Sequence, residues 1–314
     1  METLQFNNNS QNFVRTNIEY TYKVLQEDIN NLKLKFPFLE VGEIGRSVLN
    51  KSIPYIKIGS GKRKVFYNGS FHANEWITTP VLMKFIQDYA YALINDSNLL
   101  GVSAAKLYEQ VSLYVVPMVN PDGVDLVTGG LKNVENSYKK TEDIANDFPN
   151  ILFPSGWKAN INGVDLNLQF PAEWYTARNI KYEQGFNKPA PRDFPGYGPL
   201  TEPEALAVYN FTLKHNFNLV IAYHTQGKEI YWKFMNYEPN ESEFIAEEFA
   251  KVSGYTVAEV PYNSSFAGYK DWFIQEYKRP GFTIEAGIGE NPLPISQFDE
   301  IYKDNIGILV AGLL

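Results

Sequence analysis

Residues 64–76 read KVFYNGSFHANEW. The first five, Lys64–Asn68, are rich in β-forming residues and predict a short strand, which His72 and Glu75 follow directly. A histidine and a glutamate at this spacing can face one side of a turn and offer a nitrogen and a carboxylate oxygen to a metal ion. Two histidines and one carboxylate with an open fourth position form a known catalytic zinc site. The spacing alone is weak evidence, because an ordinary helix start can contain the same pair.

The second histidine of such a site has one good candidate among the three histidines of the chain. His224 ends the apolar run Leu219–Tyr223, which predicts another strand. Ligands of open α/β sheets bind beyond the carboxyl ends of the strands, where both His72 and His224 would lie. His215 follows Lys214 at a predicted helix end, where a cation suits the helix dipole, and we interpret it as structural.

Glu285 closes a third apolar run, Phe282–Ile284, at the same predicted sheet edge. A desolvated carboxylate there would have a raised pKa and would suit a general base that activates zinc-bound water. Taken alone, a solvated glutamate at a strand end is the simpler interpretation.

Strands and helices alternate along the rest of the chain, with an irregular stretch from Asn120 to about Pro199 that predicts a functional surface. We expect one α/β domain over residues 15–314, with a mixed, mostly parallel sheet covered on both faces, and a flexible N-terminus over residues 1–14. The expected helices are 15–33, 78–94, 203–214, 241–252, 269–277 and 295–313, and the expected strands are 53–58, 64–68, 112–118, 219–223 and 281–284.

The composition excludes several classes of protein. The 314 residues include 28 Lys+Arg and 36 Asp+Glu, a net charge of −8, which argues against nucleic acid or an anionic membrane as the main partner. There is no cysteine, so disulfides, thiolate metal sites and cysteine nucleophiles are excluded. No secretory signal and no apolar run of membrane-spanning length is found, which predicts a soluble cytoplasmic protein without membrane insertion. Association with spores and the oligomeric state stay open.

Five motifs in sequence order resemble the zinc carboxypeptidase A-like family, over about residues 15–312. They are His72–Thr78, Asn120–Gly123, Gly163–Asn167, His224 and Ile284-Glu285. The resemblance implies a single α/β domain with a mixed, roughly eight-stranded sheet flanked by helices, and one zinc ion (Zn²⁺) per chain.

The resemblance also implies roles for individual residues. His72, Glu75 and His224 match the zinc ligands, and Glu285 matches the general acid/base. Asp165 matches the residue that orients the first histidine, a contact that fixes the imidazole tautomer.

Further matches concern the substrate. Lys158 lies nearest to the position of the cation that stabilises the oxyanion. The mobile tyrosine that closes over the substrate falls at about Tyr262, with Tyr269 as the competing choice.

One departure from the family pattern affects the pair of residues, an asparagine and an arginine, that holds the terminal carboxylate of the substrate as a fork in the family. Asn167 is present, but Leu168 stands where an arginine is typical, and leucine has no hydrogen-bond donor. This departure argues against the release of a single C-terminal residue. Lys158, Arg178 and Arg192 are all conceivable replacements for the lost arginine.

A second departure concerns the pocket for the leaving residue. Lys270, just before Asp271, takes the position that lines this pocket, where a cation favours a carboxylate on the substrate side chain. The alternative is a solvated lysine on a surface helix.

With these two departures, the sequence resembles a subgroup of the family, the γ-D-glutamyl-meso-diaminopimelate peptidase I enzymes of spore-forming bacteria. The matching segments are Gly163–Asn167, Gln169–Ala172 with Trp174, His224–Gly227 and Gly268–Trp272. This resemblance implies hydrolysis of the γ-D-glutamyl-diaminopimelate bond in peptidoglycan stem peptides, with small muropeptides as substrates and Lys270 paired with the extra carboxylate of diaminopimelate.

Three other functions are alternatives to a γ-D-glutamyl-diaminopimelate peptidase. A conventional carboxypeptidase acting on ordinary peptides conflicts with Leu168. A catalytically inactive muropeptide-binding protein would not need the complete set of three ligands and Glu285. A structural zinc site usually has four protein ligands, often cysteines, and this chain has no cysteine.

Overall fold

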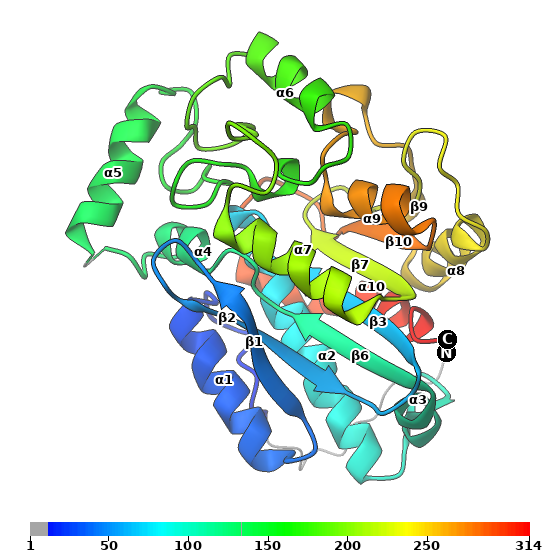
Figure 1. Ribbon diagram of the computed structural model, residues 1–314. Coiled ribbons are helices and arrows are strands. Elements are labelled where there is room, and N and C mark those ends of the chain that lie inside the picture. Colours follow the sequence, from blue (N-terminus) through cyan, green and yellow to red (C-terminus); the bar gives the residue numbers. More distant parts are fainter. Residues whose placement is uncertain (1–11, 133) are drawn as a thin grey trace.

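The computed structural model describes residues 12–132 and 134–314 and confirms a single α/β domain built on an eight-stranded mixed sheet (Figure 1). The strand order is β1-β2-β6-β3-β7-β10-β8-β9, and β4 and β5 form a separate pair. The strands are β1 (Glu40–Arg46), β2 (Ser52–Ile58), β3 (Arg63–Gly69), β4 (Asn98–Leu99), β5 (Val102–Ser103), β6 (Val111–Val116), β7 (Leu219–His224), β8 (Glu229–Tyr231), β9 (Thr256–Val257) and β10 (Gly281–Glu285).

The centre of the sheet is parallel, and it brings three strand ends together. Strands β6, β3, β7 and β10 run in the same direction. Strand β2 pairs antiparallel with both β1 and β6, and β8 pairs antiparallel with β10 and parallel with β9. Every residue of β6 and β7 is buried, as expected for parallel strands that are covered on both faces. In the register, Gly69 lies opposite Tyr223, and His224 lies opposite Glu285. The carboxyl ends of β3, β7 and β10 therefore meet at one edge.

Helices cover both faces of this sheet and enclose two hydrophobic cores (Figure 1). Side chains from α1, α2, α8 and α10 fill one core, and side chains from α6, α7 and α9 contribute to the other. The helices are α1 (Tyr22–Lys35), α2 (Thr78–Ile94), α3 (Ala104–Gln110), α4 (Pro121–Val127), α5 (Glu135–Asn146), α6 (Trp174–Glu183), α7 (Pro203–His215), α8 (Ser242–Ser253), α9 (Tyr269–Tyr277) and α10 (Phe298–Ala311), with 3-10 turns η1 (Ala73–Glu75), η2 (Leu166–Leu168), η3 (Tyr262–Ser264) and η4 (Ile295–Gln297). Within the two described ranges, no helix is both long and apolar enough to cross a bilayer.

The first helix begins later than the sequence predicts. It starts at Tyr22 rather than residue 15, because the Thr21 hydroxyl accepts a hydrogen bond from the backbone N–H of Val24 and caps the helix there. Residues 1–11 of the expected flexible terminus lie outside the described residues. Val14 is buried, and its backbone N–H donates to the side-chain oxygen of Gln87 on α2 at 2.9 Å.

The stretch predicted to be irregular, 120–199, contains α4, α5 and α6 as well as long loops. Its first residue organises the loops around the site. The Asn120 side chain accepts a hydrogen bond from the backbone N–H of Gly123 and donates to the carbonyl oxygens of Phe71 and Ala159. Gly123 is required here, because a Cβ atom would lie 2.8 Å from the Ala159 carbonyl oxygen. The Asn-Pro-Asp-Gly motif thus fixes two loops beside the strand end that carries His72.

Candidate metal centre and active site

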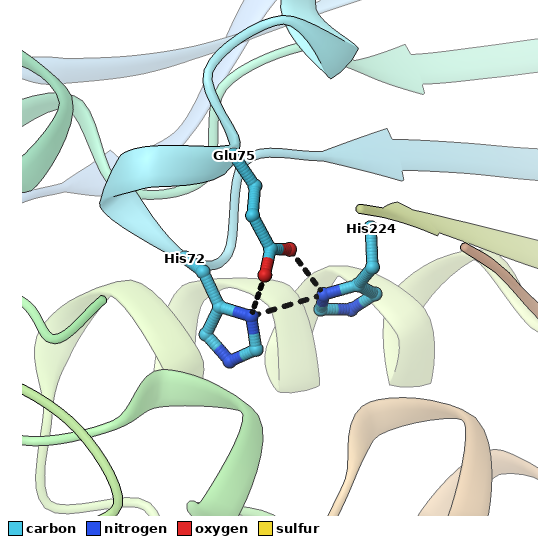
Figure 2. A group of neighbouring side chains, drawn as sticks. All are labelled: His72, Glu75 and His224. Atoms are coloured by element: carbon cyan, nitrogen blue, oxygen red, sulfur yellow. Dashed lines mark hydrogen bonds and ion pairs between the residues drawn. The ribbon is translucent and has the colours of Figure 1, made fainter. Parts of the chain in front are cut away.

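The three predicted metal ligands converge at the carboxyl edge of the sheet (Figure 2). His72 follows β3, Glu75 ends the turn η1, and His224 is the last residue of β7. Nδ1 of His72 lies 2.9 Å from Oε1 of Glu75, and Nδ1 of His224 lies 2.9 Å from Oε2. The ligand atoms of the three side chains all lie within 4.8 Å of one another. Two imidazole nitrogens and a carboxylate form a donor set that suits zinc.

The pKa values of the two histidines indicate a site that favours a bound cation. His72 Nε2 donates to Oδ1 of Asp165 at 3.1 Å, and its Nδ1 faces Glu75 and His224. Burial by itself would lower the pKa of His72, but the negative charges of Glu75 and Asp165 outweigh it and raise the pKa to about 9. Burial lowers the pKa of His224, which keeps this imidazole neutral and able to bind a metal. The site therefore attracts positive charge, which a zinc ion would supply.

Asp165 holds the first histidine in place, as predicted. Besides His72, its Oδ1 accepts a hydrogen bond from the backbone N–H of Asn167 at 3.1 Å, and its Oδ2 accepts one from the backbone N–H of Asp193 at 3.3 Å. Burial raises the pKa of this carboxyl group, but the charge and hydrogen bond of His72 hold the pKa well below its usual range. The carboxylate is thus ionised and fixes the tautomer of His72.

Glu285 lies at the end of β10, directly beside His224 in the register. It lines the same cavity as the three ligands. Burial and the nearby charge of Glu75 raise its pKa to about 8. A carboxyl group whose pKa lies near neutrality can both take up and release a proton at physiological pH.

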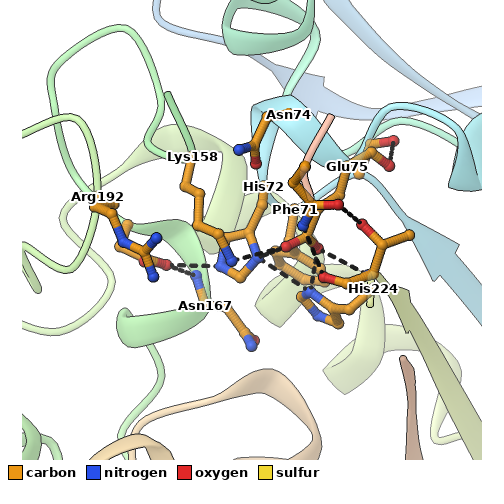
Figure 3. A network of polar contacts seen from close by, with 12 residues as sticks. Phe71, His72, Asn74, Glu75, Lys158, Asn167, Arg192 and His224 are labelled. Carbon is orange, nitrogen blue, oxygen red and sulfur yellow. Dashed lines mark hydrogen bonds and ion pairs between the residues drawn. The ribbon is translucent and has the colours of Figure 1, made fainter. Parts of the chain in front are cut away.

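Lys158 brings a positive charge to the ligands. Its Nζ lies 2.9 Å from Oε1 of Glu75. Burial would lower the pKa of Lys158, but the charge of Glu75 outweighs it and raises the pKa, so the side chain is an ammonium ion. Figure 3 shows Lys158 reaching the site beside His72 and Glu75, where a cation can stabilise developing negative charge.

A cavity of about 620 Å³ opens over these residues and contains the predicted Asn167 and Leu168 in its wall. Oδ1 of Asn167 accepts a hydrogen bond from the backbone N–H of Tyr269 at 3.0 Å. This contact fixes which way the amide points, and within the described ranges its Nδ2 has no protein acceptor. The amide hydrogens of Asn167 are therefore left without a partner among the described residues.

The two tyrosine candidates lie in different environments, and Tyr269 is ruled out as a substrate-binding residue. Its side chain is fully buried, and its hydroxyl lies 3.0 Å from the hydroxyl of Thr212, so it packs in the core and cannot close over a substrate. Tyr262 is 68% exposed on η3 and contacts the ring of Phe266, while the preceding Pro261 lines the cavity.

Lys270 lines the cavity and is not a solvated surface lysine, so that alternative interpretation is wrong. The residue is only 4% exposed. Its Nζ donates to the carbonyl oxygen of Lys233 at 2.7 Å and lies 2.6 Å from Oδ1 of Asp271. The structure thus places the Lys270 cation at the wall of the cavity, paired with Asp271.

Sequence reasoning missed Lys181 and Asp193 and left Arg192 among three alternatives, although all three line the cavity. They come from α6 and the loop that follows it, where no periodicity marks them. His215, interpreted as structural, lies at the end of α7 with its ring 4.4 Å from that of Phe211.

A buried carboxylate and two histidines, with an acidic and a basic side chain around an open cavity, are the arrangement of a metal-dependent hydrolase. The class can be stated more narrowly from comparison with known proteins. Residues 25–307 match the family model described as zinc carboxypeptidase, and the chain belongs to this family of zinc metallopeptidases. The resemblance stated from the sequence motifs is confirmed.

Two relatives cover most of the chain. The gamma-D-glutamyl-L-diamino acid endopeptidase 1 of Lysinibacillus sphaericus is 51% identical over 294 residues, which make up 94% of this chain and 72% of that protein. The uncharacterized protein YqgT of Bacillus subtilis (strain 168) is 43% identical over 296 residues, 94% of this chain and 77% of that protein. Among solved structures, carboxypeptidase A from Helicoverpa armigera has the same fold, with a TM-score of 0.71 and 18% identity over 98% of this chain and 76% of that one.

Proposed function

We propose that this zinc peptidase hydrolyses the γ-D-glutamyl-meso-diaminopimelate bond of peptidoglycan stem peptides. The observation that carries the proposal is the 51% identity to a relative named for the γ-D-glutamyl-L-diamino acid bond. The cavity supports the same substrate, because diaminopimelate carries an additional carboxylate that Lys270 can bind. Leu168 in the cavity wall argues against an ordinary carboxypeptidase.

The residues of the site divide the chemistry among them. His72, Glu75 and His224 would hold the zinc ion, which would supply Lewis-acid polarisation of the scissile carbonyl group and lower the pKa of a water molecule. Glu285 takes the proton of that water at its carboxylate and delivers it to the nitrogen of the leaving diaminopimelate. Lys158 stabilises the negative charge that develops on the carbonyl oxygen.

The remaining residues orient the substrate and the site. Asp165 keeps His72 in the tautomer that presents Nδ1 to the metal. Asn167 donates its free amide hydrogens to a substrate oxygen, and Lys270 binds the distal carboxylate of diaminopimelate. Tyr262, exposed beside the cavity, is the residue that can fold over the bound peptide.

Mass spectrometry of the products tests the substrate. Zinc-loaded protein is incubated with L-Ala-γ-D-Glu-meso-diaminopimelate-D-Ala, and a chelated sample serves as the control. We expect cleavage between D-Glu and diaminopimelate, lost on chelation. Release of D-Ala alone would instead identify a conventional carboxypeptidase, and binding without cleavage would identify an inactive muropeptide-binding protein.

A substitution of Lys270 tests the specificity. We expect Lys270→Ala to raise KM about tenfold or more for the diaminopimelate peptide, because a charged hydrogen bond is lost. The lysine analogue, which lacks the extra carboxylate, should change much less. Comparing two substrates in one variant cancels any general loss from leaving Asp271 unpaired, and Lys303→Ala, at an exposed position of α10, controls for removal of a surface charge. Equal losses on both substrates would exclude Lys270 from specificity.

A further inference from the structure

Arg192 reaches the catalytic cavity from the loop between α6 and α7, beside Lys158 (Figure 3). Its Nε donates to Oδ2 of Asp193 at 2.6 Å, and Nζ of Lys181 lies 2.7 Å from Oδ1 of the same carboxylate. The base of the guanidinium group is thus anchored. In the part of the chain that the structure describes, neither Nη atom of Arg192 has a hydrogen-bond acceptor. The side chain is 42% exposed, so this end of the fork is open to a ligand.

The backbone around Arg192 is tied to the metal site. The carbonyl oxygen of Pro191 accepts hydrogen bonds from the backbone N–H groups of Lys158 at 2.8 Å and Ala159 at 2.9 Å. On the other side, the backbone N–H of Asp193 donates to the carboxylate of Asp165. Arg192 is therefore held between a residue that contacts Glu75 and a residue that contacts His72. Its position relative to the metal ligands is fixed before any substrate binds.

Asp165 also links Arg192 to Asn167. One carboxylate oxygen of Asp165 accepts from the backbone N–H of Asn167, and the other accepts from that of Asp193. The amide Nδ2 of Asn167 and the Nη atoms of Arg192 are therefore free donors in the wall of one cavity. Leu168, which also lines this cavity, has no donor in its side chain.

The geometry points to a carboxylate-binding fork made by Arg192 and Asn167, which holds a substrate carboxylate next to the scissile bond. An arginine whose Nε is occupied can still bind a carboxylate through its two Nη atoms in bidentate geometry. The fork rests on the proposed function for the identity of the peptide. In the tripeptide L-Ala-γ-D-Glu-meso-diaminopimelate, two free carboxylates flank the scissile bond: the α-carboxylate of D-Glu and the α-carboxylate of diaminopimelate.

The other arginine considered from the sequence is placed differently. Arg178 lies over the rings of Trp174, Tyr175 and Tyr182 on α6, with its guanidinium carbon 5.2 to 5.8 Å from the ring centres. It does not line the cavity. Arg178→Ala is therefore a matched control, since it also removes one arginine from this region.

Kinetics on three peptides test the fork: L-Ala-γ-D-Glu-meso-diaminopimelate, the same peptide with the α-carboxylate of D-Glu amidated, and the same peptide with the α-carboxylate of diaminopimelate amidated. We expect Arg192→Ala to raise KM about 10- to 100-fold on the first peptide. The effect should nearly vanish on whichever amidated peptide lacks the bound carboxylate, which identifies its source. Arg192→Lys, which keeps the charge but loses the bidentate geometry, should restore only part of the affinity, and Arg178→Ala should leave KM unchanged.

An equal loss in Arg192→Ala on all three peptides, or no loss on any, would refute the fork. A failure of the proposed substrate can be distinguished from a failure of the fork. If the wild-type protein does not cleave these peptides but cleaves an acylated dipeptide, the proposed substrate is wrong. The role of Arg192 is then tested on that dipeptide with its carboxylate free or amidated. Calorimetric binding to the zinc-loaded Glu285→Gln variant gives the same comparison without turnover.

Discussion

Replacing Glu285 by glutamine removes the proposed proton acceptor while changing little else. The two side chains have the same shape, and Glu285 lies in a strand paired on both sides, opposite His224 in β7 and Glu229 in β8. Within the described residues, the Glu285 side chain forms no hydrogen bond, so the substitution breaks none. Its carboxylate is also not among the three ligands that converge on the metal position. We therefore expect Glu285→Gln to fold and to bind zinc.

The expected loss follows from the role of Glu285 in two proton transfers. General acid–base catalysis typically contributes about 10²- to 10⁴-fold to the rate, which corresponds to about 3 to 5 kcal/mol of transition-state stabilisation. Because Glu285 both takes the proton from water and gives it to the leaving amine, the loss should lie toward the upper end of this range. The effect should appear in kcat, with KM nearly unchanged, because the residue is not required to bind the peptide.

Release of diaminopimelate, followed by chromatography, measures kcat and KM, and atomic absorption measures the zinc content of the same samples. Circular dichroism confirms the fold. A Glu285→Gln protein that contains zinc and retains kcat within about threefold of the wild type would refute the role of Glu285 as general base, since that residual rate lies far above the expected one. A protein that has lost its zinc would instead contradict the assignment of the ligands.

Two further predictions concern residues outside the reacting groups. Asp165→Asn should weaken zinc binding about 10- to 100-fold, because the partner that orients His72 is lost, and a competition titration with a chelator measures it; unchanged affinity would refute this role. Glu204 is fully buried, accepts a hydrogen bond from the backbone N–H of Val48, and has a pKa that burial raises to about 7. The folded state therefore binds this proton more tightly than the unfolded state, so raising the pH from about 4.5 to 7 should cost on the order of 3 kcal/mol of unfolding free energy. Denaturant titrations at the two pH values should show this loss of unfolding free energy in the wild type and a smaller loss in Glu204→Gln. Equal losses in the two proteins would contradict the role of Glu204.

The centre of the fold could be predicted because its strands are continuous apolar runs. The predicted strands at 64–68, 219–223 and 281–284 correspond to β3, β7 and β10. Strand β1 was missed because its sequence, EVGEIGR, has no apolar alternation, and none of its residues is fully buried at the sheet edge. Strands β8 and β9 are too short to leave a pattern.

The site residues that lie at the ends of strands could be predicted from the sequence, and those whose positions are set by the course of a loop could not. His72 and His224 were paired correctly because each follows a parallel strand, and parallel strands end at the same edge. Tyr269 stayed a competing candidate to Tyr262 because its place in the chain does not reveal that its side chain is buried in the core. Asp193 is held by contacts with Asp165 and Lys181, which are distant in sequence, and it in turn holds Arg192, so no local pattern identifies these two residues.

A zinc titration of the metal-free chain, with cleavage of the γ-D-glutamyl-diaminopimelate bond as the readout, tests the central claim most directly. If His72, Glu75 and His224 form one catalytic zinc site, turnover should rise linearly with added zinc and level off at one equivalent per chain. His224→Ala should stay inactive at the same zinc concentration. Full turnover in the presence of a strong chelator, or wild-type turnover by His224→Ala, would contradict the account.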